Sequence, residues 1–325
     1  MTHATGSARV RSGTRSRNAG GRPRRELWRN LAFLSPWLVG TGLFFLYPLV
    51  ATAYLSFTHY DGFTSPRWTG LRNWSYVAHD YPFFWPAMRN TLWLVVVIVT
   101  LRVLFGLAVA LLVIRLKRSG GLFRTLYYAP YLAPPVAGTI AFVFLLNPGT
   151  GAVNVALGWL GLPQPGWFND PAWSKPSLTL LALWCIGDLM VIFMASLLDV
   201  PRDLYEAAEL DGAGAFARFR FVTLPFIQPI LVFAAVTGVI AMSQYYTEPQ
   251  VAGQVASGQI VGSGNQFEPG YPGGSTLTLP QLVYNLGFQR FDIGAACVIA
   301  LVLFVFSMVF AALLMRRGSG FLAED

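Results

Sequence analysis

Charged residues are scarce in this sequence. Asp, Glu, Lys and Arg together make up 12% of its 325 residues, whereas 54% are hydrophobic. A soluble globule of this length needs more polar side chains than that to cover its surface. The shortage of charge therefore excludes a soluble domain and predicts a membrane protein.

Cysteine and histidine are also rare. The two cysteines, Cys185 and Cys297, both lie within apolar runs, where a disulfide is not expected. The three histidines, His3, His59 and His79, are far apart in the sequence, and no group of residues has the spacing of metal ligands. We therefore expect no metal centre.

Motifs for nucleotide binding and catalysis are missing as well. The pattern G-x-x-x-x-G-K-[ST] does not occur, so the chain has no P-loop. It has no nucleophile elbow, and its nearest carboxylate pair, Asp188 and Glu206, is predicted to lie at two different depths in the membrane. We therefore expect no enzymatic activity, no cofactor on this chain, and an energy source on another subunit.

Positive charge, in contrast, is concentrated near the N-terminus. Eight arginines fall within the first thirty residues and outside any packed motif. This favours a disordered tail over residues 1–30 that sets membrane topology, and it argues against a nucleic-acid partner. The arginines are Arg9, Arg11, Arg15, Arg17, Arg22, Arg24, Arg25 and Arg29.

Long apolar stretches are abundant. A membrane-spanning helix needs about 20 apolar residues, and six stretches qualify. We therefore predict an all-α polytopic membrane protein with about six spanning helices within residues 31–316, followed by a short tail at 317–325. The predicted spans are 31–57, 91–114, 125–146, 177–198, 228–247 and 292–315.

Prolines interrupt two of these predicted spans. The first contains Pro36 and Pro48, and the third contains Pro130, Pro134 and Pro135. We expect a kink or a short entry helix in both, because proline removes a backbone donor. No internal repeat is visible, so an inverted-repeat secondary transporter gains no support.

The flanks of the spans differ in positive charge. Seventeen Lys and Arg residues lie in segments predicted to share one side of the membrane, and five lie on the other side. Because positive residues mark the cytoplasmic side, both termini and the loop at 199–227 are predicted to be cytoplasmic.

Two ionisable residues lie within the predicted spans, Arg102 in the second and Asp188 in the fourth. A charge at the bilayer centre costs about 2.5 to 3.5 kcal/mol on insertion scales, so such residues normally face the bundle interior and often pair. We predict that both point inward and neutralise each other. The pair is compatible with a place on a substrate path and equally with a purely structural role.

A polar cluster lies near the outer end of the fifth predicted span. Its hydroxyl and amide groups suit hydrogen bonding to a neutral polyol, and they suit hydrogen bonds between helices equally well. The cluster consists of Ser243, Gln244, Tyr245 and Tyr246.

Residues 206–229 form the longest polar segment between two apolar runs. Just before it, Pro201 precedes a run of helix formers, and residues 204–210 are predicted to form a short helix. Gly212 is expected to end this helix, because glycine readily adopts the left-handed conformation of a helix C-terminus.

A second short helix is expected to follow. Asp211 can cap its N-terminus near Ala213. Pro225 and Pro229 are then expected to stop the helical pattern before the next apolar run. The loop at 199–227 is therefore predicted to contain a short helix, a tight turn and a second short helix.

Small and acidic residues recur in this loop at characteristic positions. They are Glu206, Ala207, Ala208, Asp211, Gly212, Ala213, Phe219, Leu224 and Pro225. This pattern resembles the EAA loop of ABC importer permeases, with one conservative departure at Val222, where that family more often has Ile. The resemblance implies that the first helix is a coupling helix that docks in a cleft of a separate ATPase subunit.

The resemblance also assigns roles to individual residues. It implies that Glu206 meets a basic group on the ATPase and that Gly212 allows the turn. It implies further that Ala207 and Ala208 allow close approach between the two subunits.

Other parts of the chain support the same family. Residues 34–62 with 68–74, and residues 270–310, resemble the opening and the final span of sugar-uptake permeases in binding-protein-dependent ABC importers. The likeness covers about 34–316 and implies a type I importer fold with a six-helix core in the bacterial cytoplasmic membrane. The implied partners are a second permease, two ATPase subunits that bind ATP and Mg, and an extracytoplasmic solute-binding protein.

The implied function is uptake of a sugar, oligosaccharide or polyol. Glycerol-phosphate uptake by the same architecture is an alternative, although it would call for more cationic residues than Arg102. An ion-coupled secondary carrier is an alternative from another class, with Asp188 as its one intramembrane carboxylate. Residues 248–275 are longer and more polar than the usual link in the family.

Overall fold

The computed structural model of the protein describes residues 23–116, 119–258 and 270–319. Residues 1–22, the greater part of the predicted N-terminal tail, lie outside the described residues. The chain divides into two compact units, Met1–Ala51 and Thr52–Asp325.

The first unit is helical wherever it is described. Its helix begins at Pro23, so regular structure starts seven residues earlier than the predicted boundary of the tail at residue 30. Pro36 lies inside this helix without ending it, and the regular pattern changes instead at a π-helical turn beginning at Gly42. The elements are α1 (Pro23–Thr41), η1 (Gly42–Leu46) and α2 (Tyr47–Leu55), which continues into the second unit.

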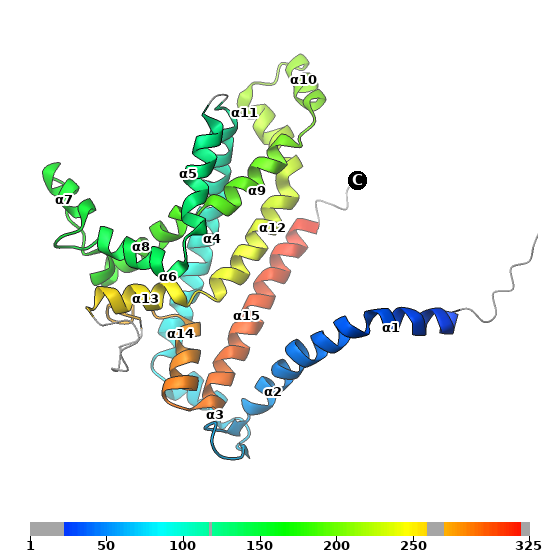
Figure 1. Ribbon diagram of the computed structural model, residues 1–325, viewed down its shortest axis with the longest axis vertical. Helices are drawn as coiled ribbons and strands as arrows, with labels where there is room; N and C mark the ends of the chain where they lie inside the picture. Colours follow the sequence, from blue (N-terminus) through cyan, green and yellow to red (C-terminus); the bar gives the residue numbers. More distant parts are fainter. Residues whose placement is uncertain (1–22, 117–118, 259–269, 320–325) are drawn as a thin grey trace, which may run out of the picture. The chain divides into compact units, whose positions relative to one another are not determined.

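Three long helices form the frame of the second unit, where α4 packs against α12 and α12 packs against α15 (Figure 1). The helix that contains the second predicted span is α4, which begins before residue 91, at Phe84. Asn90 lies in the first turns of α4 and lowers their hydropathy. It is nevertheless buried, and its side chain is hydrogen-bonded to the Leu277 carbonyl oxygen. The helices are α4 (Phe84–Ile114), α12 (Leu224–Ser243) and α15 (Ile293–Ser319).

Two predicted spans are broken helices. The third, expected over 125–146, consists of α5 and α6, whose axes differ by 103°. Proline explains this break, because Pro134 and Pro135 supply no backbone donors to α5. The fourth, expected over 177–198, consists of α8 and α9, bent by 49° at residues without proline. The helices are α5 (Gly120–Leu132), α6 (Pro135–Leu145), α8 (Pro171–Trp184) and α9 (Gly187–Leu198).

The helix that contains the fifth predicted span begins well before residue 228. A helical segment runs without interruption over residues 215–243 and includes a π-helical turn. The expectation that Pro225 and Pro229 stop the helix is therefore wrong. Pro225 lies just after the π-helical turn at 219–223, where the hydrogen-bond pattern is already shifted, and the helix also accommodates Pro229. The segments before α12 are α11 (Ala215–Arg218) and η4 (Phe219–Thr223).

Short elements cover the two ends of the second unit. One end carries α10, and the other carries α3 and α14 (Figure 1). The one strand pair among the described residues is antiparallel, with Thr58 opposite Trp68. These elements are β1 (Thr58–His59), β2 (Arg67–Trp68), α3 (Arg72–Ser75), η2 (Tyr76–Asp80), α7 (Ala152–Trp159), η3 (Trp167–Asn169), α10 (Arg202–Leu210), α13 (Thr247–Ala256), α14 (Leu279–Tyr284) and η5 (Asn285–Gln289).

The described residues contain four helices long and apolar enough to cross a membrane, or six if each bent pair is one span. The four are the helical segments 30–55, 84–114, 215–243 and 293–316. The fold is therefore that of an all-α polytopic membrane protein, as the hydropathy pattern predicts.

The segment 274–279, which leads into α14, folds back into the bundle beside α4. Asn90 Nδ2 donates to the carbonyl oxygens of Gly274 and Leu277 at 2.9 and 3.0 Å. The Leu279 N–H donates to Thr91 Oγ1 at 3.0 Å. These bonds satisfy non-helical backbone inside the bundle, which is the condition under which such backbone is tolerated at membrane depth.

Candidate functional sites

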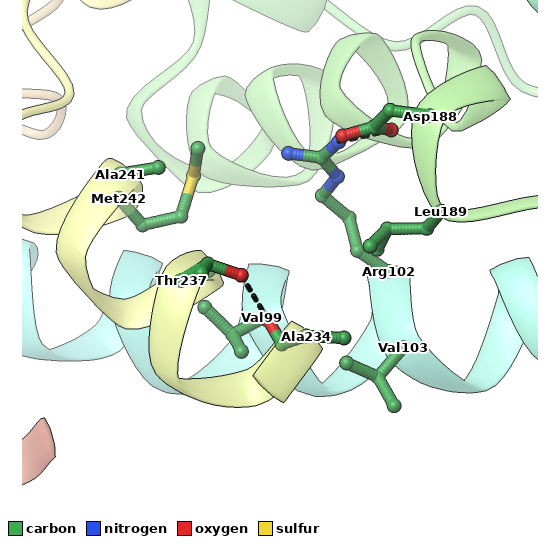
Figure 2. A pocket seen from close by; sticks show the side chains of 10 residues that line it. Val99, Arg102, Val103, Asp188, Leu189, Ala234, Thr237, Ala241 and Met242 are labelled. Carbon is green, nitrogen blue, oxygen red and sulfur yellow. Dashed lines mark hydrogen bonds and ion pairs between the residues drawn. The ribbon is translucent and has the colours of Figure 1, made fainter. Parts of the chain in front are cut away.

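An ion pair lies inside the bundle between α4 and α9. Arg102 Nη2 lies 2.9 Å from Asp188 Oδ1 and 3.1 Å from Asp188 Oδ2 (Figure 2). The two side chains are 15% and 26% exposed. The predicted neutralisation of these two residues is confirmed.

The ion pair lies at the break between α8 and α9. Arg102 Nη2 also donates to the carbonyl oxygen of Cys185, the residue that ends α8, at 3.4 Å. Asp188 lies in the first turn of α9, where the positive end of the helix dipole favours a carboxylate. One guanidinium therefore bridges the C-terminus of α8 and the N-terminus of α9.

Glycines let the helices approach closely around this pair. A Cβ atom on Gly187 would lie 2.6 Å from the backbone oxygen of Tyr127, so α9 packs directly on the backbone of α5. A Cβ on Gly238 would lie 3.1 Å from Val99 Cγ1, which brings α12 against α4. The ion pair is thus held where α4, α5, α9 and α12 converge.

Two cavities adjoin Arg102. The first has a volume of about 140 Å³ and lies between α4, α9 and α12 (Figure 2). Its polar lining is Arg102, Asp188 and Thr237, whose hydroxyl donates to the Phe233 carbonyl oxygen at 2.8 Å. The second cavity has a volume of about 170 Å³, and its polar lining includes Arg102, Thr139, Cys185, Tyr245 and Glu248.

Two residues that line the second cavity each have a polar atom that is buried without a hydrogen-bond partner among the described residues. The two atoms are the Tyr245 hydroxyl, on a side chain that is 5% exposed, and Arg102 Nε. Burial raises the pKa of the nearby Glu248 carboxyl above its usual value, and the Arg102 guanidinium opposes this rise. Unsatisfied buried groups are costly, so their convergence on one cavity indicates a place for a polar ligand or water.

The predicted polar cluster at 243–246 is divided by the structure. Tyr245 alone among these residues lines a cavity with Arg102. Ser243 Oγ donates to its own helix at Val239, and Gln244 lines a separate apolar cavity between α12 and α15. Tyr246 packs against Tyr284 with ring centroids 5.4 Å apart.

Sequence reasoning missed four polar cavity residues, Thr139, Cys185, Thr237 and Glu248. Thr237 and Cys185 sit within apolar runs and carry no charge, so nothing in the pattern marks them. Glu248 had a usable signal, because it is an acidic residue directly after an apolar span. Among the residues that the structure describes, no group of three or more His, Cys, Asp or Glu side chains could hold a metal ion.

At one end of the bundle, residues 202–218 form a helical hairpin, called here the exposed hairpin (Figure 1). Helix α10 ends in a Schellman motif: the Ala213 N–H donates to the Ala208 carbonyl at 2.9 Å, and the Gly212 N–H donates to the Glu209 carbonyl at 3.0 Å. Gly212 has φ +75°, so its predicted left-handed conformation is confirmed.

The second helix of the exposed hairpin starts differently from the prediction. Asp211 is the C-cap of α10, and α11 begins after Gly214 without a side-chain cap. The expectation that Asp211 caps a helix near Ala213 is therefore wrong, because the Schellman turn places both residues outside the second helix. Glu209 on α10 pairs with Arg218 on α11 instead.

The exposed hairpin presents apolar side chains to its surroundings. None of the residues of α10 is buried, and Leu210 and Phe216 are 90% and 79% exposed. Glu206 and Ala207 are exposed, and Ala208 is half-buried. Exposed apolar side chains beyond the end of a bundle indicate a surface that another molecule covers.

Other residues of the predicted motif attach the exposed hairpin to the bundle. Phe219 and Leu224 are half-buried, and Phe219 packs against the core between α9 and α12. The Tyr205 hydroxyl lies 2.8 Å from Thr223 Oγ1. Pro225 is exposed on the first turn of α12.

Comparison with known proteins agrees with this architecture, although no family model matches the chain. The lactose transport system permease protein LacF of Rhizobium radiobacter is 31% identical over 261 residues, which cover 79% of this chain and 82% of LacF. The diacetylchitobiose uptake system permease protein NgcF of Streptomyces coelicolor is 30% identical and covers 93% of this chain and 87% of NgcF.

A third relative is the arabinooligosaccharides transport system permease protein AraP of Halalkalibacterium halodurans, 30% identical over 85% of this chain and 83% of AraP. A crystal structure of a bacterial ABC transporter that imports the acidic polysaccharide alginate contains a similar fold. It has a TM-score of 0.70 and 20% identity, and covers 90% of this chain and 98% of that one.

A bundle of broken and continuous spans with a helical hairpin beyond one end defines a multi-pass membrane transport subunit. The chain belongs to the family of sugar ABC transporter permeases.

Proposed function

We propose that this chain couples ATP hydrolysis on a partner ATPase to the uptake of a sugar, oligosaccharide or polyol. The observation that carries the proposal is the exposed hairpin, whose apolar residues Leu210 and Phe216 are not covered by any of the described residues. Its EAA-type residues, led by Glu206 and Gly212, occupy the surface that an ATPase cleft would contact. The relatives with lactose, diacetylchitobiose and arabinooligosaccharides in their names support the substrate class.

The assembly that follows contains this chain, a second permease, two ATPase subunits and an extracytoplasmic solute-binding protein. A related fold in the alginate transporter occurs in complex with a pentasaccharide-bound periplasmic protein, which supports the last of these partners. ATP and Mg would be bound by the ATPase subunits, and this chain would carry no cofactor. The excess of Arg and Lys on one side supports cytoplasmic termini and a cytoplasmic exposed hairpin.

The helical segment 215–243 supplies a mechanical connection between the two sites. It begins in the exposed hairpin and continues to Thr237 and Met242, which line the first cavity. Movement of an ATPase cleft would therefore reach the cavities through one continuous helix and tilt α12 against α4. Such rocking is a rigid-body mode of alternating access.

The rival ion-coupled carrier has less support. Such a carrier needs an intramembrane carboxylate that is free to take up and release its ion. Asp188 instead accepts two hydrogen bonds from Arg102, so its carboxylate is already occupied by a partner within the chain.

The test is co-purification from detergent-solubilised membranes. A tagged chain should retain the ATPase and the second permease, whereas a variant with Glu206→Gln, Ala207→Leu and Gly212→Val should retain the permease and lose the ATPase. Gly70→Val is a matched control, because Gly70 also has a positive φ of +63° and open space around it but lies near the opposite end. Capture of the ATPase by the triple variant at the wild-type level would overturn the proposal.

A further inference from the structure

The lining of the two cavities carries an excess of negative charge. Arg102 is common to both, Asp188 lines the first and Glu248 lines the second. One cation therefore faces two carboxylates. No other Lys, Arg, Asp or Glu lines either cavity among the described residues.

The positive charge of Arg102 is already balanced by Asp188. Its Nη2 atom serves both oxygens of Asp188 and the carbonyl of Cys185. The guanidinium still offers N–H donors, because Nη1 takes part in none of these bonds and Nε is buried and unpartnered. These donors suit hydroxyl oxygens, whereas an anion gains little net attraction from a guanidinium that a carboxylate already neutralises.

The remaining polar groups also suit a hydroxyl. Tyr245 has a buried hydroxyl that can donate or accept, and the Glu248 carboxyl can accept from a sugar O–H. Thr139 adds a hydroxyl whose own proton is donated to the Pro135 carbonyl at 2.7 Å, so that its oxygen remains an acceptor. The second cavity thus offers donors and acceptors in the mixture that a neutral polyol presents.

We infer that the cavities select uncharged saccharides and exclude acidic ones, and that Glu248 determines this specificity. That the ligand is a saccharide rests on the proposed function, whereas the exclusion of anions rests on the charged residues that line the cavities. The names of related proteins leave the matter open, since they include a lactose permease and a transporter of acidic alginate. With Arg102 neutralised by Asp188, an anion entering the second cavity meets Glu248 without a compensating cation.

Cys185 makes the exclusion measurable, because it lines the second cavity and is half-buried, whereas Cys297 is buried elsewhere. Three methanethiosulfonates would be applied to the transporter with its partner subunits in nanodiscs: the neutral methyl, the cationic trimethylammonioethyl and the anionic sulfonatoethyl reagent. In each case the cysteine thiolate attacks the alkylthio sulfur of the reagent, a mixed disulfide forms, and the bond to the sulfonyl sulfur breaks with release of methanesulfinate. Mass spectrometry of the Cys185 peptide gives each rate, normalised to that of a free thiol in solution.

The anionic reagent should label Cys185 at least about tenfold more slowly than the cationic one. Glu248→Gln should remove most of this difference and leave the rate of the neutral reagent unchanged. Asp199→Asn is the matched control, because it also removes one carboxylate but lies exposed at the far end of α9. That variant should retain the wild-type ratio.

A second arm uses glucose and glucuronate at equal ionic strength as probes. Glucose should slow the neutral reagent at Cys185, glucuronate should not, and Glu248→Gln should bring the two sugars closer together. The anionic reagent could still label Cys185 more slowly than the cationic one while neither sugar slows labelling. The exclusion of anions would then stand, and the proposal that saccharides pass through this cavity would fail.

Equal normalised rates for the anionic and cationic reagents would overturn the inference, as would a ratio that Glu248→Gln leaves unchanged. Absence of labelling by all three reagents would overturn it too, because the cavity would then be closed to solutes.

Discussion

Two interruptions of helical structure, the break between α8 and α9 and the turn between α10 and α11, each contain a glycine that serves a different purpose. Gly212 in the turn has φ +75° and nothing within 4 Å of the place where a Cβ would be, so it is needed for its backbone conformation. Gly187 at the break has backbone of α5 only 2.6 Å from that place, so it is needed for space.

The two interruptions also differ in what stabilises them. The turn satisfies its own backbone through the Schellman bonds of Gly212 and Ala213, all within a few residues. The break relies on Arg102, which comes from a different helix, and on contact with α5. A locally stabilised turn can meet a partner without support from the bundle, whereas the break exists only within the assembled bundle.

The largest effect that separates the two regions is expected from the ion pair. Arg102→Gln or Asp188→Asn alone should destabilise the protein by about 3 kcal/mol, because each leaves a partly buried charge without its partner. The double variant should recover much of this loss, since no unpaired charge remains. Thermal unfolding of the purified protein in detergent measures all three.

If either single variant were as stable as the wild type, the pair would contribute nothing to the break. The α8–α9 break would then resemble the α10–α11 turn in depending on local bonds.

Gly187→Val should have the next largest effect, about 1 to 3 kcal/mol, because the added side chain collides with backbone that has little room to move. The loss should appear as a lower unfolding temperature and a lower yield of monodisperse protein. Gly121→Val is the matched control, since Gly121 lies on α5 with nothing within 4 Å of its Cβ position. Equal stability of these two variants would contradict the close packing of α9 on α5.

Gly212→Val should have the smallest effect on stability and a selective effect on function. The left-handed conformation costs a β-branched residue about 1 to 2 kcal/mol, and this cost falls on the turn alone. The unfolding temperature should hardly change, while ATP hydrolysis and uptake by the reconstituted transporter become uncoupled.

Gly212→Asn provides the control, because Asn tolerates the left-handed region. It should preserve coupling. Wild-type uptake by Gly212→Val would show that the turn is not required in this conformation.

The contrast between the break and the turn also explains which of their features can be predicted from the sequence. The turn at Gly212 was predictable because helix formers, glycine and the motif lie within a few residues of one another. The pairing of Arg102 with Asp188 was predictable because charges in apolar spans seek partners. That the pair bridges a helix break was not, because Arg102 is 83 residues away from Cys185 in the sequence.

Other misses have a similar origin. Pro225 and Pro229 are expected to stop the helix, but a preceding π-helical turn lets the helix continue. Glu248 belongs to the long polar link at 248–275, although α13 packs across α6 and brings it to the second cavity. The first difference has a local cause in the hydrogen-bond pattern, and the second comes from tertiary packing.

Asn90 and Thr91 of α4 form hydrogen bonds with the segment 274–279, and these bonds constrain the order in which the chain folds. Their partners, Leu277 and Leu279, follow 187 and 188 residues later in the sequence. During synthesis the amide of Asn90 and the hydroxyl of Thr91 enter the bundle long before the groups that satisfy them exist. Helix α4 therefore completes its hydrogen bonds only after residues 277–279 have been synthesised, when the chain is nearly complete.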